Sequence, residues 1–423
     1  MPAPAADFPT RLRGLDAASY DYATQFVELL LAGARERSTS DVHLQPTPQG
    51  LAIRWRIDGV LQSLGEFPRG QAADVVTRLK VLAQLLTYKT DIPQEGRIPA
   101  AGDCEMRVST FPTLYGERAV VRLFAAERQF LHVEDLGLPE EIHASFVGLL
   151  DETSGAILIT GPAGSGKTTT AYACLRHIAR QSQARRSIVS LEDPIEMALD
   201  GVAQSQVNPA AGFDLPTGLR SLMRQDPEVI LVGEIRDSET AATAFQASLT
   251  GHLVLTTFHA GSAASGLARL IDLGIEPYLV RSGVRALLHQ RLVRRLCACA
   301  SDATAGTAGQ ASSGTPAWDP FLGLPIKAAR IATGCPNCSQ TGYRGRLVLA
   351  ELLPPLEGDL GRAVLARTDA LGLHRLATAA GMIALFQRAC QAAEAGQTDP
   401  AEIRRVLGFG GRESLAGEDN PSN

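Results

Sequence analysis

The chain has 423 residues, and at roughly 100 to 200 residues per domain this length predicts two or three domains. Its net charge is −5 and only four of its forty basic residues are lysines, so neither a polybasic arm nor a nucleic-acid-binding stripe stands out. We therefore expect no direct nucleic-acid partner. No secretory signal and no run of about 18 apolar residues occurs, so we expect a cytoplasmic chain.

The first third of the chain predicts a small α+β domain. Residues 1–20 are rich in Ala and Pro and are expected to be disordered, whereas Phe26, Leu29 and Leu30 have helical spacing. Further along come an alternating strand, a hairpin turn, an amphipathic helix and two more strands, at Leu51–Ile57, Asp58-Gly59, Val75–Leu86, Met106–Thr110 and Ala119–Phe124. We therefore place this domain at 21–130 and a linker at 131–138.

The pattern then changes to short apolar strands separated by helices. The strands are Ala156–Thr160, Ser187–Leu191, Val229–Gly233 and His252–Thr257. Alternation of this kind predicts an α/β core with a mainly parallel sheet over residues 139–296. A ligand of such a sheet binds at the carboxyl ends of its strands.

A complete phosphate-binding loop follows the first of these strands. Its residues are Gly161, Pro162, Ala163, Gly164, Ser165, Gly166, Lys167 and Thr168. Backbone N–H groups and the start of the next helix, including Thr169, cradle phosphates; Lys167 reaches the β- and γ-phosphates, and the Thr168 hydroxyl ligates Mg²⁺. The glycines keep Cβ atoms away from the phosphates. The alternative, a glycine-rich turn that merely joins strand to helix, does not need the Lys-Thr pair.

Acidic residues end two other strands. Glu234 follows Val229–Gly233 and is the candidate general base and Mg²⁺ ligand, because a phosphate site needs a carboxylate to orient water. Glu192 and Asp193 follow another strand and are candidates for positioning water or the metal. Helix capping is the alternative for that pair, and an ordinary solvated strand end is the alternative for Glu234.

Two histidines flank the strand 253–258. His252 and His259 are seven residues apart, so they lie on opposite faces of a fully extended strand, and only one of them is expected to face the nucleotide. A structural, hydrogen-bonded role is the alternative for each.

Four stretches, in this order, resemble the Walker A, Asp box, Walker B and His box of the secretion ATPase superfamily. They are residues 161–168, Leu191–Glu196, Arg224–Asp237 and Thr250–His259. Five others resemble its type II secretion and type IV pilus assembly branch, the "E" proteins of the general secretory pathway: Ser40–Pro46, Arg54–Leu61, Pro93–Arg97, Gln290–Cys297 and Thr341–Arg346. The resemblance covers residues from about 22 to 408.

The resemblance implies a hexameric motor with a PAS-like N-terminal domain and a RecA-like P-loop ATPase core. Such motors hydrolyse ATP with Mg²⁺ and act on an inner-membrane platform protein to extrude a pilin-like fibre. By motif position, Arg97 and Arg107 match the arginines of the smaller domain that approach the phosphates, and Arg236 is a candidate sensor of the nucleotide state. Assembly ATPases commonly carry a further N-terminal docking domain, whereas only about twenty residues precede the resemblance here. We therefore expect membrane association to run through the platform protein or another surface.

Four of the seven cysteines form two close pairs, which favours a metal site over a disulfide framework. Cys335 and Cys338 have the two-residue gap that lets both thiolates bind one Zn²⁺. The matching pair, Cys297 and Cys299, has a one-residue gap where the family has two. We expect a tetracysteine module at 297–350, with a flexible insertion at 300–318, and reduced cysteines without metal are the alternative. A helical region at 351–410 and a disordered tail at 411–423 follow.

Two other classes of function remain possible on this core. A nucleic-acid translocase or DNA-uptake motor shares the RecA-like fold, but the acidic balance and the lack of base-stacking aromatic clusters argue against it. A noncatalytic ATP-binding scaffold has no need for Lys167, Thr168 and Glu234 together.

Overall fold

The computed structural model describes residues 8–70, 74–99, 104–125, 130–183, 185–303 and 321–408. The chain divides into two compact units. The first contains the N-terminal residues to 127 together with Cys297–Cys299 and Ala332–Gly345, and the second contains the remainder. The predicted flexible insertion and C-terminal tail lie largely or wholly outside the described residues, so they stay predictions.

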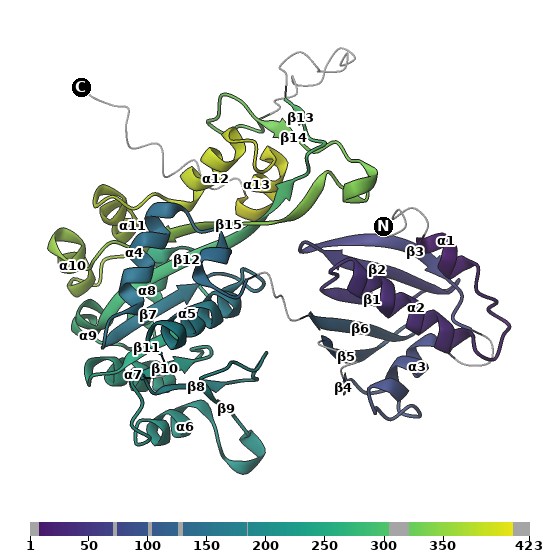
Figure 1. Ribbon diagram of the computed structural model, residues 1–423, viewed down its shortest axis with the longest axis horizontal. Helices are drawn as coiled ribbons and strands as arrows, with labels where there is room; N and C mark the ends of the chain where they lie inside the picture. Colours follow the sequence, from purple (N-terminus) through teal and green to yellow (C-terminus); the bar gives the residue numbers. More distant parts are fainter. Residues whose placement is uncertain are drawn as a thin grey trace. The chain divides into compact units, whose positions relative to one another are not determined.

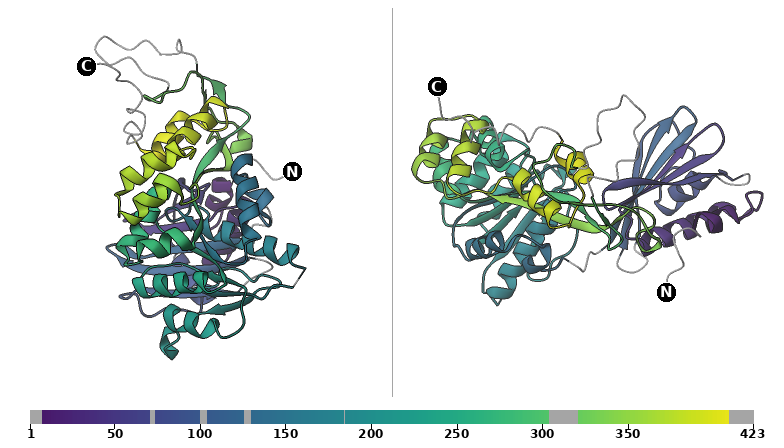
Figure 2. Two further views of the ribbon diagram at one scale, coloured as in Figure 1. Left: turned by 90° about the vertical axis from the view of Figure 1, so that its left-hand side faces the viewer. Right: turned by 90° about the horizontal axis from the view of Figure 1, so that it is seen from above.

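The first unit is a six-stranded antiparallel sheet with helices against one face (Figures 1 and 2). Its sheet order is β3-β2-β1-β6-β5-β4. The elements are α1 (Phe8–Arg13), α2 (Tyr22–Glu36), β1 (Asp41–Pro46), β2 (Leu51–Ile57), β3 (Val60–Phe67), α3 (Val75–Leu82), β4 (Gln94–Ile98), β5 (Cys104–Thr113) and β6 (Gly116–Ala125). Inward residues of the alternating strands pack on the apolar faces of α2 and α3, which is the predicted α+β arrangement.

The prediction of disorder for residues 1–20 is wrong from Phe8 onward. Phe8 and Leu12 of α1 are buried, and the Phe8 ring lies 4.8 Å from that of Trp55. Gly33 of α2 makes room for this ring, since a Cβ there would lie 2.2 Å from Phe8 Cε2. Two apolar side chains at helical spacing thus outweigh the surrounding Ala and Pro residues.

The second unit is built on a seven-stranded sheet of order β15-β12-β7-β11-β10-β8-β9. Strands β7, β8, β9, β10, β11 and β12 pair in parallel, as the alternating pattern predicted. The strands are β7 (Gly155–Thr160), β8 (Ile188–Glu192), β9 (Ala203–Gln206), β10 (Val229–Val232), β11 (Leu253–Phe258), β12 (Val284–Leu296) and β15 (Tyr343–Leu352). The 3₁₀ turn η2 (Val133–Leu136) and helix α4 (Glu140–Leu150) precede β7. Helices between the strands are α5 (Lys167–Gln181), α6 (Leu215–Leu222), α7 (Ser238–Leu249), α8 (Ala263–Asp272) and α9 (Pro277–Gly283), with the short 3₁₀ turn η3 (Pro209–Ala211).

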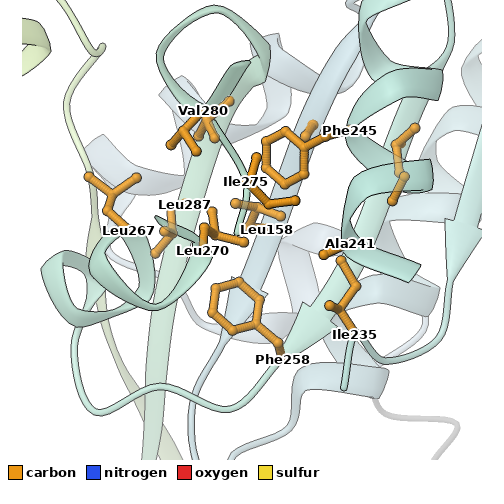
Figure 3. Packing of buried hydrophobic residues seen from close by; sticks show 14 of the residues in the cluster. Leu158, Ile235, Ala241, Phe245, Phe258, Leu267, Leu270, Ile275, Val280 and Leu287 are labelled. Carbon is orange, nitrogen blue, oxygen red and sulfur yellow. The ribbon is translucent and has the colours of Figure 1, made fainter. Parts of the chain in front are cut away.

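Apolar side chains fill both faces of this sheet. On one face, Leu158 and Phe258 of the strands pack with Phe245 of α7 and Leu267 of α8 (Figure 3). On the other face a second cluster joins the strands to α4 and α5. Continuous burial of β7, β10 and β11 on both sides explains why their sequences are uninterrupted apolar runs.

The predicted linker 131–138 is partly ordered within the second unit. It forms η2, whose Val133 is fully buried in the cluster beneath α5, and Glu134 pairs with Arg180 of α5 at 3.1 Å. Val133 therefore anchors this segment against the helix that follows the phosphate loop.

The C-terminal part continues the second unit, apart from Ala332–Gly345, which belongs to the first. Its helices are α10 (Gly358–Leu365), α11 (Ala370–Ala379), α12 (Leu385–Glu394) and α13 (Pro400–Leu407), preceded by the two-residue strands β13 (Ser301–Asp302) and β14 (Arg330–Ile331) and by η4 (Pro336–Cys338). Glu351 of β15 is buried and accepts hydrogen bonds from the N–H groups of Ala263 and Leu385, at the starts of α8 and α12. Within the described ranges, no helix is long and apolar enough to cross a membrane.

Candidate nucleotide site

The phosphate loop lies at the carboxyl edge of the parallel sheet. It connects β7 to α5, so the positive end of the α5 dipole faces the loop. The Lys167 side chain is buried and its Nζ donates to the carbonyl oxygens of Gly161 and Pro162, at 3.1 and 3.2 Å. The structure therefore forms the strand, loop and helix that the sequence predicts.

A pocket of about 150 Å³ opens beside this loop. It is lined by Lys167, Thr168, Ala171, Tyr172, Glu192, Asp193, Pro194, Glu196, Leu215, Leu231, Gly233, Glu234, Arg236 and Thr257. Five segments distant in the sequence meet here, because parallel strands end at one edge of the sheet. The pocket thus brings together both catalytic carboxylate candidates with the lysine and threonine of the loop.

Glu234 is held between two basic side chains. Its Oε1 lies 3.0 Å from Nε2 of His259, and its Oε2 accepts from Nε of Arg236 at 2.8 Å. Arg236 also lies 3.6 Å from Asp193, and Nδ1 of His259 is 3.1 Å from the carbonyl oxygen of Gly161. Both ring nitrogens of His259 therefore face oxygen atoms, and the histidine joins the phosphate loop to the carboxylate.

Glu192 is held by neutral side chains that the sequence reasoning did not single out. The residue is 3% exposed, its Oε1 accepts from Ser190 Oγ at 2.6 Å and Gln204 Nε2 at 3.1 Å, and its Oε2 accepts from the Tyr172 hydroxyl. These partners fix the carboxylate in one orientation at the pocket wall. Tyr172 also accepts from the N–H of Glu196 at 3.2 Å, so its own position is set by the Asp box backbone.

Burial shifts two ionisable groups in this pocket. It lowers the pKa of the Lys167 ammonium, an effect that the nearby Glu234 carboxylate opposes. Burial, together with the hydrogen bond to Glu192, raises the pKa of the Tyr172 hydroxyl, which therefore remains a donor. A partly desolvated lysine interacts strongly with a phosphate that enters the pocket.

The structure separates His252 from the site. It precedes β11, whose first residue pairs with Gly155, whereas the other end of β11 pairs with Thr160 beside the loop. Its Nδ1 lies 3.0 Å from the carbonyl oxygen of Ala247, at the end of α7. Of the two histidine candidates, His259 alone lies at the nucleotide edge, and His252 has the structural role that was its alternative.

Arg97 and Arg107 belong to the first unit. They face each other across β4 and β5, and Arg107 is in turn opposite Arg122 of β6. Residues directly opposite in an antiparallel sheet share a face, so the three arginines form one row. The row continues to Asp41 of β1, which lies opposite Arg122 and pairs with it at 2.9 Å.

The four predicted metal-binding cysteines lie together in the first unit, with all four sulfur atoms within 4.8 Å of one another. Measured pairs are 3.9 Å for Cys297 and Cys335, 3.8 Å for Cys299 and Cys338, and 3.7 Å for Cys335 and Cys338. Four thiolates at about 2.3 Å from a tetrahedral zinc ion are about 3.8 Å apart. The one-residue gap between Cys297 and Cys299 is therefore compatible with a tetrahedral set.

Backbone groups support a thiolate in this cluster. The N–H groups of Cys335 and Gly342 point at Cys338 Sγ, at 3.1 and 3.2 Å. Burial raises the pKa of the Cys338 thiol, but these donated hydrogen bonds outweigh it and lower the pKa to about 6. Metal binding requires the deprotonated form, so the cluster has both the donor set and the geometry for zinc.

The fold and site define a P-loop ATPase of the secretion type, and a family model described as "Type II/IV secretion system protein" matches residues 16–405. The chain belongs to this family. It is 38% identical to the "Putative type II secretion system protein E" of Escherichia coli (strain K12), over 90% of this chain and 76% of that protein. It is 42% identical to the "Type II secretion system protein E" of Pectobacterium carotovorum subsp. carotovorum, over 84% of this chain and 70% of the relative.

Solved structures show the same fold at lower identity. The pilus retraction motor PilT with bound ADP aligns with a TM-score of 0.60 and 22% identity, covering 92% of this chain and 98% of PilT. The Legionella pneumophila ATPase DotB aligns with a TM-score of 0.65 and 21% identity, covering 90% of this chain and 95% of DotB. The RecA-like fold predicted from the motif series is thereby confirmed.

Proposed function

We propose that this chain binds ATP and Mg²⁺ at the phosphate loop and hydrolyses ATP to ADP and phosphate. The observation that carries the proposal is the pocket in which Lys167 and Thr168 of the loop lie with Glu234 and Glu192. In the proposed reaction Lys167 binds the β- and γ-phosphates and Thr168 and Glu234 hold the metal. Glu234 accepts the proton of the attacking water, and Glu192 and Asp193 orient that water or the metal.

The proposed motor is a homohexamer at the cytoplasmic face of the inner membrane, bound there through partners. Nucleotide turnover changes the orientation of its two units and drives a platform protein that extrudes a pilin-like fibre. Arg97 and Arg107 supply positive charge to the phosphates during this cycle, and Arg236, tied to both Glu234 and Asp193, responds to the nucleotide state. The proposal of a secretion motor is supported by the family and by the names of relatives that are type II secretion E proteins.

Zinc is the proposed ligand of the four cysteines. The sulfur spacing and the N–H groups that point at Cys338 support it. When bound, the ion crosslinks two segments 38 residues apart, at Cys297 and Cys335.

The test is Mg²⁺-dependent ATP hydrolysis by the purified chain. Lys167→Ala should abolish turnover, on the order of a hundredfold or more, because it removes the charge that binds the phosphates. Lys327→Ala is the matched control, since Lys327 is exposed and should retain wild-type turnover. Hydrolysis that survives Lys167→Ala, or turnover that appears only with DNA, contradicts the proposal.

A further inference from the structure

Gln290 lies against the phosphate loop without belonging to it. The residue is on β12, next to β7, and is 1% exposed. Its Nε2 donates to the carbonyl oxygen of Ser165 at 2.7 Å, and its Oε1 accepts from Thr170 Oγ1 at 2.9 Å. One buried amide thus joins the loop to the first turn of α5. Because a carbonyl oxygen only accepts, the Ser165 oxygen fixes the amide with its nitrogen toward the loop.

The hydrogen bond to Ser165 sets the direction of a loop N–H group. In a planar trans peptide, the carbonyl and the N–H of the following residue point in opposite directions. Because the Ser165 oxygen is fixed toward Gln290, the Gly166 N–H points away from Gln290. Donation to the carbonyl also polarises the peptide, which makes that N–H a better hydrogen-bond donor.

Two glycines of the loop lie so close to Gln290 that a side chain at either position would crowd it. Gly161 has φ +150°, and a Cβ there would lie 2.4 Å from the carbonyl oxygen of Gln290. Gly166 has φ +87°, and its Cβ would lie 3.2 Å from Gln290 Nε2. The loop therefore packs directly on Gln290, and the glycines serve this contact as well as the approach of phosphate.

We propose that Gln290 is a positioning residue for the nucleotide phosphates. It holds the Ser165–Gly166 peptide so that the Gly166 N–H donates to the β-phosphate, and it does not touch the nucleotide itself. The inference rests on the proposed binding of nucleotide at the loop. In this role a residue of β12 strengthens nucleotide binding, whereas the carboxylates Glu234 and Glu192 act in hydrolysis.

The experiment measures the affinity of the full chain for fluorescent mant-ADP. Gln290→Met keeps the shape of the side chain but removes both hydrogen bonds, so the Kd should rise on the order of tenfold. Thr170→Val removes only the hydroxyl that donates to the amide oxygen of Gln290 and should raise the Kd about threefold. Gln246→Met, at an exposed position of α7, is the control and should bind as the wild type does.

A positioning role predicts a higher KM for ATP, with kcat at saturating ATP within about threefold of wild type. Wild-type affinity in Gln290→Met overturns the inference. If that variant does not fold, Thr170→Val decides: a raised Kd supports the inference, and a wild-type Kd overturns it. If the wild-type chain itself does not bind mant-ADP, the proposed function fails and not the role of Gln290.

Discussion

Glu234 and Glu192, two of the acidic residues that line the pocket, are held by different kinds of side chain. Glu234 lies between His259 and Arg236, which are both basic, whereas Glu192 accepts from a tyrosine, a serine and an amide. A carboxylate that is paired with movable basic groups can exchange them for a metal or water. A carboxylate that is buried and fully hydrogen-bonded keeps its place, so we expect Glu192 to orient and Glu234 to react.

Tyr172→Phe tests whether Glu192 has this orienting role. The change removes one donor from the Glu192 carboxylate, and a hydrogen bond to a charged group contributes about 1.5–3 kcal/mol. We expect kcat for ATP to fall on the order of tenfold while the Kd for ADP stays within twofold, because the Tyr172 hydroxyl bonds to Glu192 and to the Glu196 N–H. Steady-state kinetics and mant-ADP titration measure the two effects, and a variant with unchanged kcat removes Tyr172 from the account.

Residues that depend on local sequence could be predicted, and those that depend on distant contacts could not. The loop, Glu234 and His259 follow recognisable strands, so their place at the edge of a parallel sheet follows from the pattern. Tyr172 contacts Glu192 from 20 residues away and Thr170 contacts Gln290 from 120 residues away, in helices and strands whose apolar spacing says nothing about them. The sequence left open which of His252 and His259 faces the nucleotide, and the strand direction in the sheet decides it, because His252 precedes β11 and His259 follows it.

At the scale of elements, β12 places a second buried polar side chain beside β7. His289 is fully buried, and its Nδ1 lies 3.1 Å from Thr160 Oγ1. Burial, with smaller contributions from Arg291 and Lys167, lowers the pKa of His289 to about 3. The ring therefore stays neutral in the folded chain at any pH at which the unfolded chain begins to bind a proton.

This difference predicts a pH dependence of stability. Below about pH 6.5 the unfolded histidine gains a proton that the folded one does not bind, so folding stability falls as the pH falls from about 6.5 toward 3, by up to about 1.4 kcal/mol per pH unit. His289→Gln should reduce the loss in the urea midpoint between pH 7 and pH 5. His374→Gln, at a half-buried position of α11, is the comparison. If the urea midpoint falls equally between pH 7 and pH 5 in wild type and His289→Gln, His289 does not cause the pH dependence.

The cysteine cluster is the other element with a direct test. The purified chain should contain about one zinc ion, and the double change Cys335→Ser with Cys338→Ser should remove it, because two sulfur ligands cannot complete a tetrahedral site. Cys390→Ala is the control, since Cys390 lies in α12 outside the cluster. Metal analysis gives the result, and a full complement of zinc in the double variant contradicts the site.

Elements were predicted best where burial imposes a regular pattern. The continuous apolar strands of the second unit and the alternating strands of the first are both present. Helix α1 was missed because its stability comes from a recess at Gly33 that receives the Phe8 ring, and composition carries no sign of that recess. The order of the linker segment was missed for the same reason, since Val133 is buried only through tertiary contacts with α5.

At the scale of the molecule, the chain separates two sets of residues. The phosphate loop and both carboxylates belong to the second unit, and the arginine row belongs to the first. The order of the domains along the chain could be predicted from the order of the motifs alone, because motif order is a property of the sequence.

Hydrolysis by Glu234 is the step on which this account depends, and Glu234→Gln tests it most directly. The amide cannot accept a proton from water but keeps the size of the side chain, so ATP turnover should fall on the order of a hundredfold or more while mant-ADP still binds. Glu239→Gln, an exposed residue of α7, should behave as wild type. Undiminished ATP turnover in Glu234→Gln, measured beside bound nucleotide in the same preparation, would contradict the assignment of this pocket as the catalytic site.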